Sequence, residues 1–188
     1  MVPAVTVLIF AWTLKGVGDV LEIGTFVGGA VGSHAAASLL APAIMFLVAL
    51  FLGFSTGTSW GTFANLVPIV VSLFSGANLE MMIISVSAVL AGAVCGDHVS
   101  PISDTTIMSS AGAQCNHINH VQTQMQYAMV VAGVCVIGYI IAAVCKNWII
   151  ALVASLAILI GALYLIRWLL DKKNAGKADD GEAASADA

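Results

Sequence analysis

The sequence predicts an all-α polytopic membrane protein, a bundle of transmembrane helices that includes a re-entrant hairpin and an interrupted helix. Of the 188 residues, 60% are hydrophobic and only 9% are charged, whereas soluble domains carry about 25% charged residues. The charges are also segregated, because no Lys or Arg occurs between Lys15 and Lys146 and only three acids follow Glu22 in that interval. This composition excludes a water-soluble surface and indicates lipid as the solvent.

The first segment is read as a membrane helix followed by a connection. Residues 3–14 form an apolar run with Pro3 at a position that suits a helix start. Residues 16–32 are rich in Gly, and Asp19 and Glu22 in this stretch are expected to face water. The abrupt apolar beginning, without the basic region of a secretory signal, leads us to expect further sequence upstream.

A first interrupted pair of apolar runs follows. The runs cover about residues 39–54 and 63–74, and a break rich in Thr, Ser and Gly separates them at residues 55–62. Each arm is shorter than the ~20 residues that a straight helix needs to cross the hydrocarbon core. The pair therefore predicts either a re-entrant hairpin or one broken span.

The same layout recurs further along the chain. Residues 81–95 are apolar, residues 96–103 are polar and contain Pro101, and a shorter mixed run continues to residue 113. Two short hydrophobic pairs interrupted by Gly or Pro are the pattern that marks the binding site of a secondary transporter. The second break is the better candidate because carboxylates lie in it.

Two ordinary spans, over about residues 125–144 and 148–170, are expected after a polar loop at residues 115–124. Arg167 and three lysines lie at the end of the last span, against Lys146 alone at its start. The positive-inside rule then places the C-terminus in the cytoplasm. We accordingly predict a transmembrane domain over residues 1–170 and a disordered cytoplasmic tail over residues 171–188.

Asp97 and Asp104 are the candidate functional carboxylates, because an ionised carboxylate at bilayer depth costs at least about 2.5 kcal/mol. In one continuous helix, Asp97, Ser100 and Asp104 would share a face. Gly96 and Pro101 favour a break instead, in which carbonyls near residues 95 and 96 point at a cation and Ser103 caps the next half-helix. The hydroxyl candidates are Ser100, Ser103, Thr105 and Thr106, with Thr58 and Ser59 from the first break.

Carboxylate, hydroxyl and carbonyl oxygens are the hard ligands that a small cation such as Na⁺ prefers. A carboxylate also binds a proton, so Na⁺ and H⁺ would compete at one site, and competition at an alternating-access site suffices for antiport. The structural alternative is that one Asp caps a half-helix while the other faces a water-filled vestibule. No cofactor is expected beyond the transported Na⁺ and H⁺.

Other polar features have simpler readings. His98 could relay protons, although a hydrogen-bonded spacer is the commoner role, and the histidines at 117 and 120 are read as a polar loop and not a metal site. The four cysteines lack a C-x-x-C spacing and are predicted to be buried free thiols.

Residues 57–61 match the G-x-S-x-G nucleophile elbow, yet they join two membrane-length apolar arms, so no enzyme is predicted. Without a basic patch, a nucleic-acid partner is not expected.

Two motifs carry a resemblance to a known family. Residues 56–62 (TGTSWGT) and 96–106 (GDHVSPISDTT) closely resemble the NhaC-type sodium/proton antiporter family of the ion-transporter superfamily, and residues 116–128 resemble the same family's loop. The resemblance implies a bacterial inner-membrane antiporter built from two inverted repeats. It carries ion-site roles to Asp97, Asp104 and the neighbouring hydroxyls, and less directly to Thr58 and Ser59.

Members of that family are about twice this length or more, so the chain is expected to be the C-terminal half, with the other repeat supplied by an absent N-terminal half. A second copy of the protein, in a homodimer, is a further candidate partner. Because related families exchange malate for lactate, or amino acids, an ion-coupled exchanger of small organic acids or amino acids remains an alternative to Na⁺/H⁺ exchange. The third hypothesis is a membrane fragment that does not transport.

Overall fold

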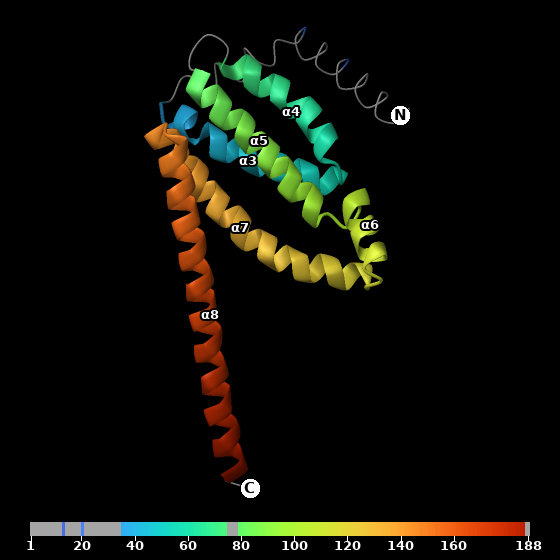
Figure 1. Ribbon diagram of the computed structural model, residues 1–188, viewed down its shortest axis with the longest axis vertical. Helices are drawn as coiled ribbons and strands as arrows, with labels where there is room; N and C mark the ends of the chain where they lie inside the picture. Colours follow the sequence, from blue (N-terminus) through green and yellow to red (C-terminus); the bar gives the residue numbers. More distant parts are fainter. Residues whose placement is uncertain (1–12, 14–19, 21–34, 75–78, 187–188) are drawn as a thin grey trace.

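The computed structural model describes Thr13, Val20 and residues 35–74 and 79–186, and the regular structure in these ranges is helical (Figure 1). The helices are α3 (Ala35–Thr56), α4 (Ser59–Phe74), α5 (Leu79–Val99), α6 (Asp104–Gly112), α7 (His117–Cys145) and α8 (Trp148–Ala186). The predicted apolar run at 3–14 and the Gly-rich stretch at 16–32 lie outside the described residues, apart from Thr13 and Val20.

Four of the described helices are long and apolar enough to cross a membrane, which confirms the predicted helical membrane class. Their candidate spans are Leu39–Thr56, Leu79–Val99, His117–Cys145 and Trp148–Leu169. The prediction that both arms of the first pair are too short is wrong for α3, which begins before the apolar run and reaches 22 residues. With 16 residues, α4 is the short arm. It turns back from the end of α3, so the two form a helical hairpin (Figure 1).

The α3 and α5 helices form the central pair, and glycines allow their backbones to touch. Gly53 of α3 faces α5, where a Cβ at this position would lie 2.6 Å from the Ala93 carbonyl oxygen. Gly92 and Gly96 of α5 face α3, and a Cβ at Gly96 would collide with the Leu50 carbonyl oxygen. Small residues four apart are the usual device for close helix approach in membranes.

Two apolar clusters flank this central pair. On one side, Leu66 and Val70 of α4 pack with Val89 of α5 and its neighbours. On the other side, Phe46 of α3 packs with residues of α5 and α7, and its ring centroid lies 5.6 Å from that of Tyr139. The α5 helix is therefore surrounded by α3, α4 and α7, which positions its C-terminal end.

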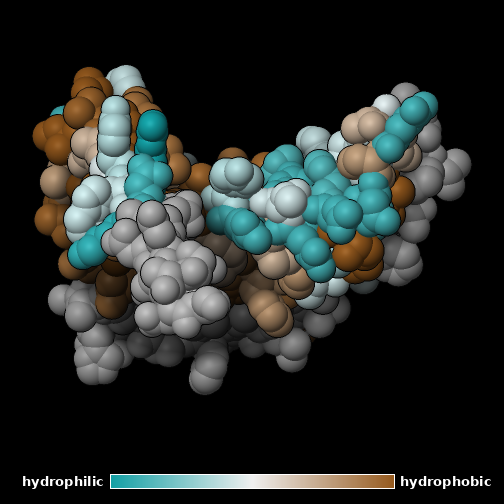
Figure 2. All heavy atoms as spheres, turned by 90° about the horizontal axis from the view of Figure 1, so that it is seen from below, coloured by the Kyte–Doolittle hydropathy of each residue, from teal (hydrophilic) through white to brown (hydrophobic). Residues whose placement is uncertain are grey.

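The start of α7 corrects the predicted loop. Residues 115–124 were expected to be irregular, but the helix begins at His117. Asn116 explains the early start, because its side chain accepts a hydrogen bond from the Asn119 N–H at 3.1 Å and so caps the helix. The polar surface on the right of Figure 2 covers the side of the molecule where α6 and the start of α7 lie.

The last helix, α8, packs on α7 and extends away from the bundle (Figure 1). It continues to Ala186, beyond residue 170, where the sequence predicts the end of the span and the start of a disordered tail. Ala, Lys and Glu are strong helix formers, which is consistent with this continuation. Arg167 and Asp171, one turn apart, approach to 3.9 Å where the apolar span ends.

Candidate functional site

The candidate site lies where the two helix breaks of the chain come together, beside α6 (Figure 1). The first break follows α3, because Gly57 adopts a φ of 64°, a left-handed conformation that favours glycine. Its N–H donates to the Gly53 carbonyl at 2.9 Å and closes the helix. The second break follows Val99, two residues before Pro101, whose ring cannot continue a helix.

A hydrogen bond joins the two breaks. The hydroxyl of Ser100, which is fully buried, donates to the carbonyl oxygen of Phe54 in the last turn of α3 at 2.7 Å. Gly57 lies directly against the second break, since a Cβ there would come within 2.9 Å of the Ile102 side chain and 3.0 Å of its carbonyl carbon. The two predicted motifs, more than 30 residues apart in sequence, therefore form one structural unit.

Asp97 is the buried carboxylate of this unit, with 8% of its surface exposed. Its Oδ1 accepts a hydrogen bond of 2.6 Å from the hydroxyl of Ser103, which is fully buried. The Ser103 hydroxyl also lies 2.8 Å from that of Thr105, and because the single Ser103 hydrogen serves Asp97, Thr105 is the donor to Ser103. A chain of hydroxyls thus leads from exposed Thr105 to the buried carboxylate.

The Ser103 hydroxyl corrects one prediction. Ser103 has the N-cap position of α6, with φ −69° and ψ 136°, but its side chain makes no capping hydrogen bond. The hydroxyl donates to Asp97 instead, and a charge-assisted bond to a carboxylate is stronger than a neutral one. Ser103 therefore supports the carboxylate and not the helix.

Asp104 has a different environment from Asp97. It is exposed and occupies the first position of α6, where a negative charge is favoured by the helix dipole. The break also separates Asp97, Ser100 and Asp104, so the shared face that one continuous helix would give them is absent from this part of the structure. Thr106 is buried and donates to the His98 carbonyl at 3.1 Å, which ties α6 to the end of α5.

The end of α5 lies further along the chain than predicted. The α5 helix continues to Val99, so the carbonyls near residues 95 and 96 remain within its last turns. Beyond them, the Asp97 carbonyl accepts the Ser100 N–H at 3.1 Å, and the Pro101 carbonyl lies 2.8 Å from Nε2 of His117. These bonds hold the connection between α5 and α6 in a defined shape.

Thr58 and Ser59 lie in the first break, but no bond links them to Asp97 among the contacts found in the described residues. Thr58 is exposed, and its carbonyl accepts the Thr62 hydroxyl at 2.9 Å. Ser59, half-buried, is the first residue of α4. The turn joins two helices and not a strand to a helix, which removes the structural context of a nucleophile elbow.

The histidines and cysteines in the described part of the chain do not form a metal site. Within the described residues, no group of three or more His, Cys, Asp or Glu side chains could hold an ion. His98 is exposed, and both ring nitrogens of His117 already face protein atoms. All four cysteines are free thiols, as predicted, but none is fully buried, because Cys95 and Cys135 are half-buried and Cys115 and Cys145 are exposed.

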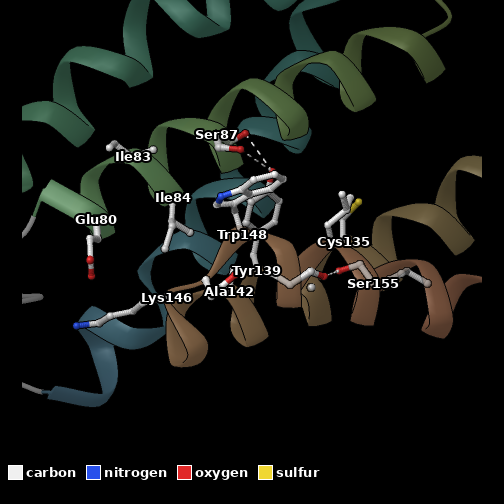
Figure 3. Close-up of a pocket in the computed structure, with 15 residues that line it drawn as sticks. Glu80, Ile83, Ile84, Ser87, Cys135, Tyr139, Ala142, Lys146, Trp148 and Ser155 are labelled. Atoms are coloured by element: carbon white, nitrogen blue, oxygen red, sulfur yellow. Dashed lines mark hydrogen bonds between the residues drawn. The ribbon is translucent and has the colours of Figure 1, made fainter.

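A cavity of about 480 Å³ lies elsewhere, between α5, α7 and α8. Figure 3 shows Glu80 and Lys146 at one end of it, with Ser87 and Tyr139 close together in its middle. The Tyr139 hydroxyl donates to the Ser87 carbonyl at 3.1 Å. The cavity is mostly apolar and is lined by the first half of α5, whereas Asp97 lies near the opposite end of that helix, so the cavity is separate from the candidate site.

Two contributors to the site were missed by reasoning from the sequence. The Phe54 carbonyl is a main-chain group in an apolar run, and only its contact with Ser100, 46 residues away, reveals it. His117 was read as part of a loop, although it contacts the second break from the start of α7. Neither contact has a local sequence signal.

The chain is similar to a known protein family and to several individual proteins. The sequence profile of the Na⁺/H⁺ antiporter family matches residues 1–144, a range that includes both breaks and ends before α8. An uncharacterized protein of Haemophilus influenzae is 43% identical over 165 residues, which is 87% of this chain and 31% of that protein. No solved structure matches.

Two further relatives have descriptive names. One is a malate-2H⁺/Na⁺-lactate antiporter of Bacillus subtilis, 29% identical over 110 residues, or 55% of this chain and 23% of that protein. The other is an uncharacterized Na⁺/H⁺ antiporter of Haemophilus influenzae, 32% identical over 108 residues, or 54% of this chain and 23% of that protein. The chain thus spans less than a third of the length of each of these three relatives.

Proposed function

Because this chain belongs to the Na⁺/H⁺ antiporter family, we propose that it forms the part of an antiporter in which Na⁺ and H⁺ compete for Asp97. The observation that carries the proposal is the burial of this carboxylate at the junction of two helix breaks, with a 2.6 Å hydrogen bond from Ser103. A carboxylate is not retained at such a place without a partner or a function.

The surroundings of Asp97 suit both ions. A sodium ion would take oxygen ligands, and the hydroxyls of Ser103, Ser100 and Thr106 lie buried around the second break. A proton would bind the same carboxylate and neutralise its charge without further ligands. When Na⁺ binds instead, the Ser103 hydroxyl would exchange its present bond to Asp97 for a contact with the cation. The hydroxyl of Thr105 connects the carboxylate to the exposed side.

Asp104, Thr58 and Ser59 have secondary roles in this proposal. Asp104 is exposed at the start of α6 and would attract cations to the entrance without binding them in the buried state. Thr58 and Ser59 line the first break and would contact the ion only in another conformation of the transporter. His98, exposed beside Asp97, would exchange protons with water.

The test is proton movement in everted vesicles that contain the complete transporter, followed with a pH-sensitive dye after addition of Na⁺. We expect Asp97→Asn to reduce the signal to background and Asp104→Asn to raise the Na⁺ concentration needed for half the signal. Asp171→Asn is the matched control, because Asp171 is an exposed carboxylate on α8. Sodium-evoked proton movement that survives the Asp97→Asn, Asp104→Asn double variant would refute the site.

The second candidate function is exchange of small carboxylates, favoured by the name of the Bacillus subtilis relative. The stretch from residue 16 to residue 145 contains no Lys or Arg to bind an organic anion, which favours the cation exchanger. The same vesicles discriminate the two, because a response to malate or lactate without a response to Na⁺ supports the carboxylate exchanger. No response to either, with the complete protein present in the membrane, supports a non-transporting fragment.

The proposal extends to the setting of the protein. It places the chain in the bacterial inner membrane with its C-terminus in the cytoplasm, together with an N-terminal part that supplies the second repeat, and allows a homodimer. The excess of basic residues at the end of the last span supports this orientation. A topology reporter fused after the last residue tests it, since a periplasmic reporter signal would reverse the orientation.

A further inference from the structure

His117 connects three elements around the candidate site. It is the first residue of α7 and is half-buried. Its Nε2 lies 2.8 Å from the carbonyl oxygen of Pro101, in the connection between α5 and α6. Its Nδ1 lies 3.0 Å from the hydroxyl of Ser110, in the last turn of α6.

The partners assign the hydrogen on the ring. A carbonyl oxygen can only accept, so Nε2 of His117 must be the protonated nitrogen that donates to Pro101. The contact with Ser110 does not assign the other nitrogen, because the Ser110 hydroxyl has one hydrogen and the Ile107 carbonyl, 2.9 Å away, also accepts it. The bond to the Pro101 carbonyl therefore requires a hydrogen-bond donor at the position of Nε2.

The connection between α5 and α6 is held from three directions. Ser100 holds it to α3 through the Phe54 carbonyl, Ser103 holds it to α5 through Asp97, and His117 holds it to α7 through Pro101. The first two bonds lie within the proposed ion site, and the third comes from outside. A binding group must be held to within about 0.5 Å to keep its geometry, and such support comes from neighbouring residues of this kind.

We propose that His117 is a positioning residue, which fixes the connection at Pro101 and thereby sets the affinity of the Asp97 site for Na⁺. The inference rests on the proposed function. His117 does not touch the ion and acts through the backbone of residues 100–103, which carries Ser100 and Ser103. Its loss would leave the carboxylate in place but allow its hydroxyl neighbours to shift.

The test compares four variants of the complete transporter. His117→Ala removes the donor, and we expect the Na⁺ concentration for half-maximal proton movement to rise about three- to tenfold, the effect of one hydrogen bond. The maximal rate per transporter should change by less than a factor of about two, because Asp97 remains. His117→Gln should restore the affinity, since its amide nitrogen reaches the position of Nε2.

Two variants serve as controls. His117→Asn places its amide near the position of Nδ1, so it keeps the contact with Ser110 but not the bond to Pro101, and it should behave like the Ala variant. His120→Ala removes a neighbouring histidine whose contact, 3.4 Å to Ser109, does not involve the connection. It should leave the Na⁺ affinity unchanged.

A second measurement does not depend on transport. Hydrogen exchange of the purified protein without Na⁺ should be faster over residues 100–103 in His117→Ala than in the native protein, and unchanged in His120→Ala. If the native protein moves no protons with Na⁺, the proposed function fails, while hydrogen exchange still tests the contact. Unchanged Na⁺ affinity in His117→Ala, equal effects in Gln and Ala variants, or unchanged exchange over residues 100–103 would overturn the positioning role.

Discussion

The close approach of α3 and α5 makes a sharp prediction for Gly96→Ala. A methyl group at this position would meet two backbone atoms of α3, the Leu50 carbonyl oxygen and, at 2.7 Å, the Phe54 nitrogen. Carbon atoms prefer separations of about 3.5–4.0 Å, so the helices would have to move apart by about 1 Å. Backbone atoms within two packed helices cannot rotate out of the way as a side chain can.

The magnitude follows from two opposing effects. Overpacking a well-packed interior costs about 1–3 kcal/mol, and a backbone collision belongs at the upper end of this range. Replacing Gly by Ala within a helix contributes about 1 kcal/mol in the opposite direction. We therefore expect Gly96→Ala to lower the free energy of unfolding by about 2 kcal/mol.

Thermal unfolding of the detergent-solubilised protein, followed by tryptophan fluorescence, measures this change. Gly133→Ala is the matched control, because Gly133 lies within α7 and a Cβ there meets nothing within 4 Å. The control should unfold at or above the native midpoint. A Gly96→Ala protein as stable as the native one, or a Gly133→Ala protein equally destabilised, would refute the close approach.

Two more substitutions test the helix ends. Ser100→Ala removes the donor to the half-buried Phe54 carbonyl, so we expect a loss of about 0.5–1.5 kcal/mol, the net contribution of one hydrogen bond, in the same unfolding assay. Lys146→Gly should instead stabilise by about 1 kcal/mol, because Lys146 ends α7 with a φ of 50°, a conformation that costs a residue with a Cβ more than it costs glycine.

Each of these has its own control. Ser109→Ala removes an exposed hydroxyl that donates to the Thr106 carbonyl within α6 and lies 3.4 Å from the ring of His120. Because the site is exposed, the effect on stability should be small. Lys146→Ala removes the charge but keeps the left-handed strain, so it should not stabilise. If the Ala and Gly variants at 146 are equally stabilised, the charge and not the backbone conformation is responsible.

The fold class and the position of both breaks could be predicted from the sequence because their causes are local. Hydrophobicity marks the helices, and Gly57 and Pro101 end them through their own backbone restrictions. The start of α7 was missed because the many His, Asn and Gln residues there resemble a loop, whereas the Asn116 side chain caps a helix that begins at His117.

The content of the candidate site was predicted more completely than its arrangement. Asp97, Ser100 and Ser103 follow from residue type, since polar groups within apolar runs are conspicuous. What each hydroxyl binds does not follow, because Ser100 reaches across to α3 and Ser103 turns back to Asp97. Such choices depend on which helices are neighbours, and helix neighbours depend on contacts between residues far apart in sequence.

The glycine contact between α3 and α5 has a mechanical consequence. At Gly53, Gly92 and Gly96 the two helices meet backbone to backbone, without a long side chain that could change rotamer at these positions. This contact holds the last turns of α3, which include the Phe54 carbonyl, against the part of α5 that bears Asp97. In the proposed antiporter, we therefore expect an opening of the site to involve the parts outside this contact, such as α6 and the four residues that lead into it.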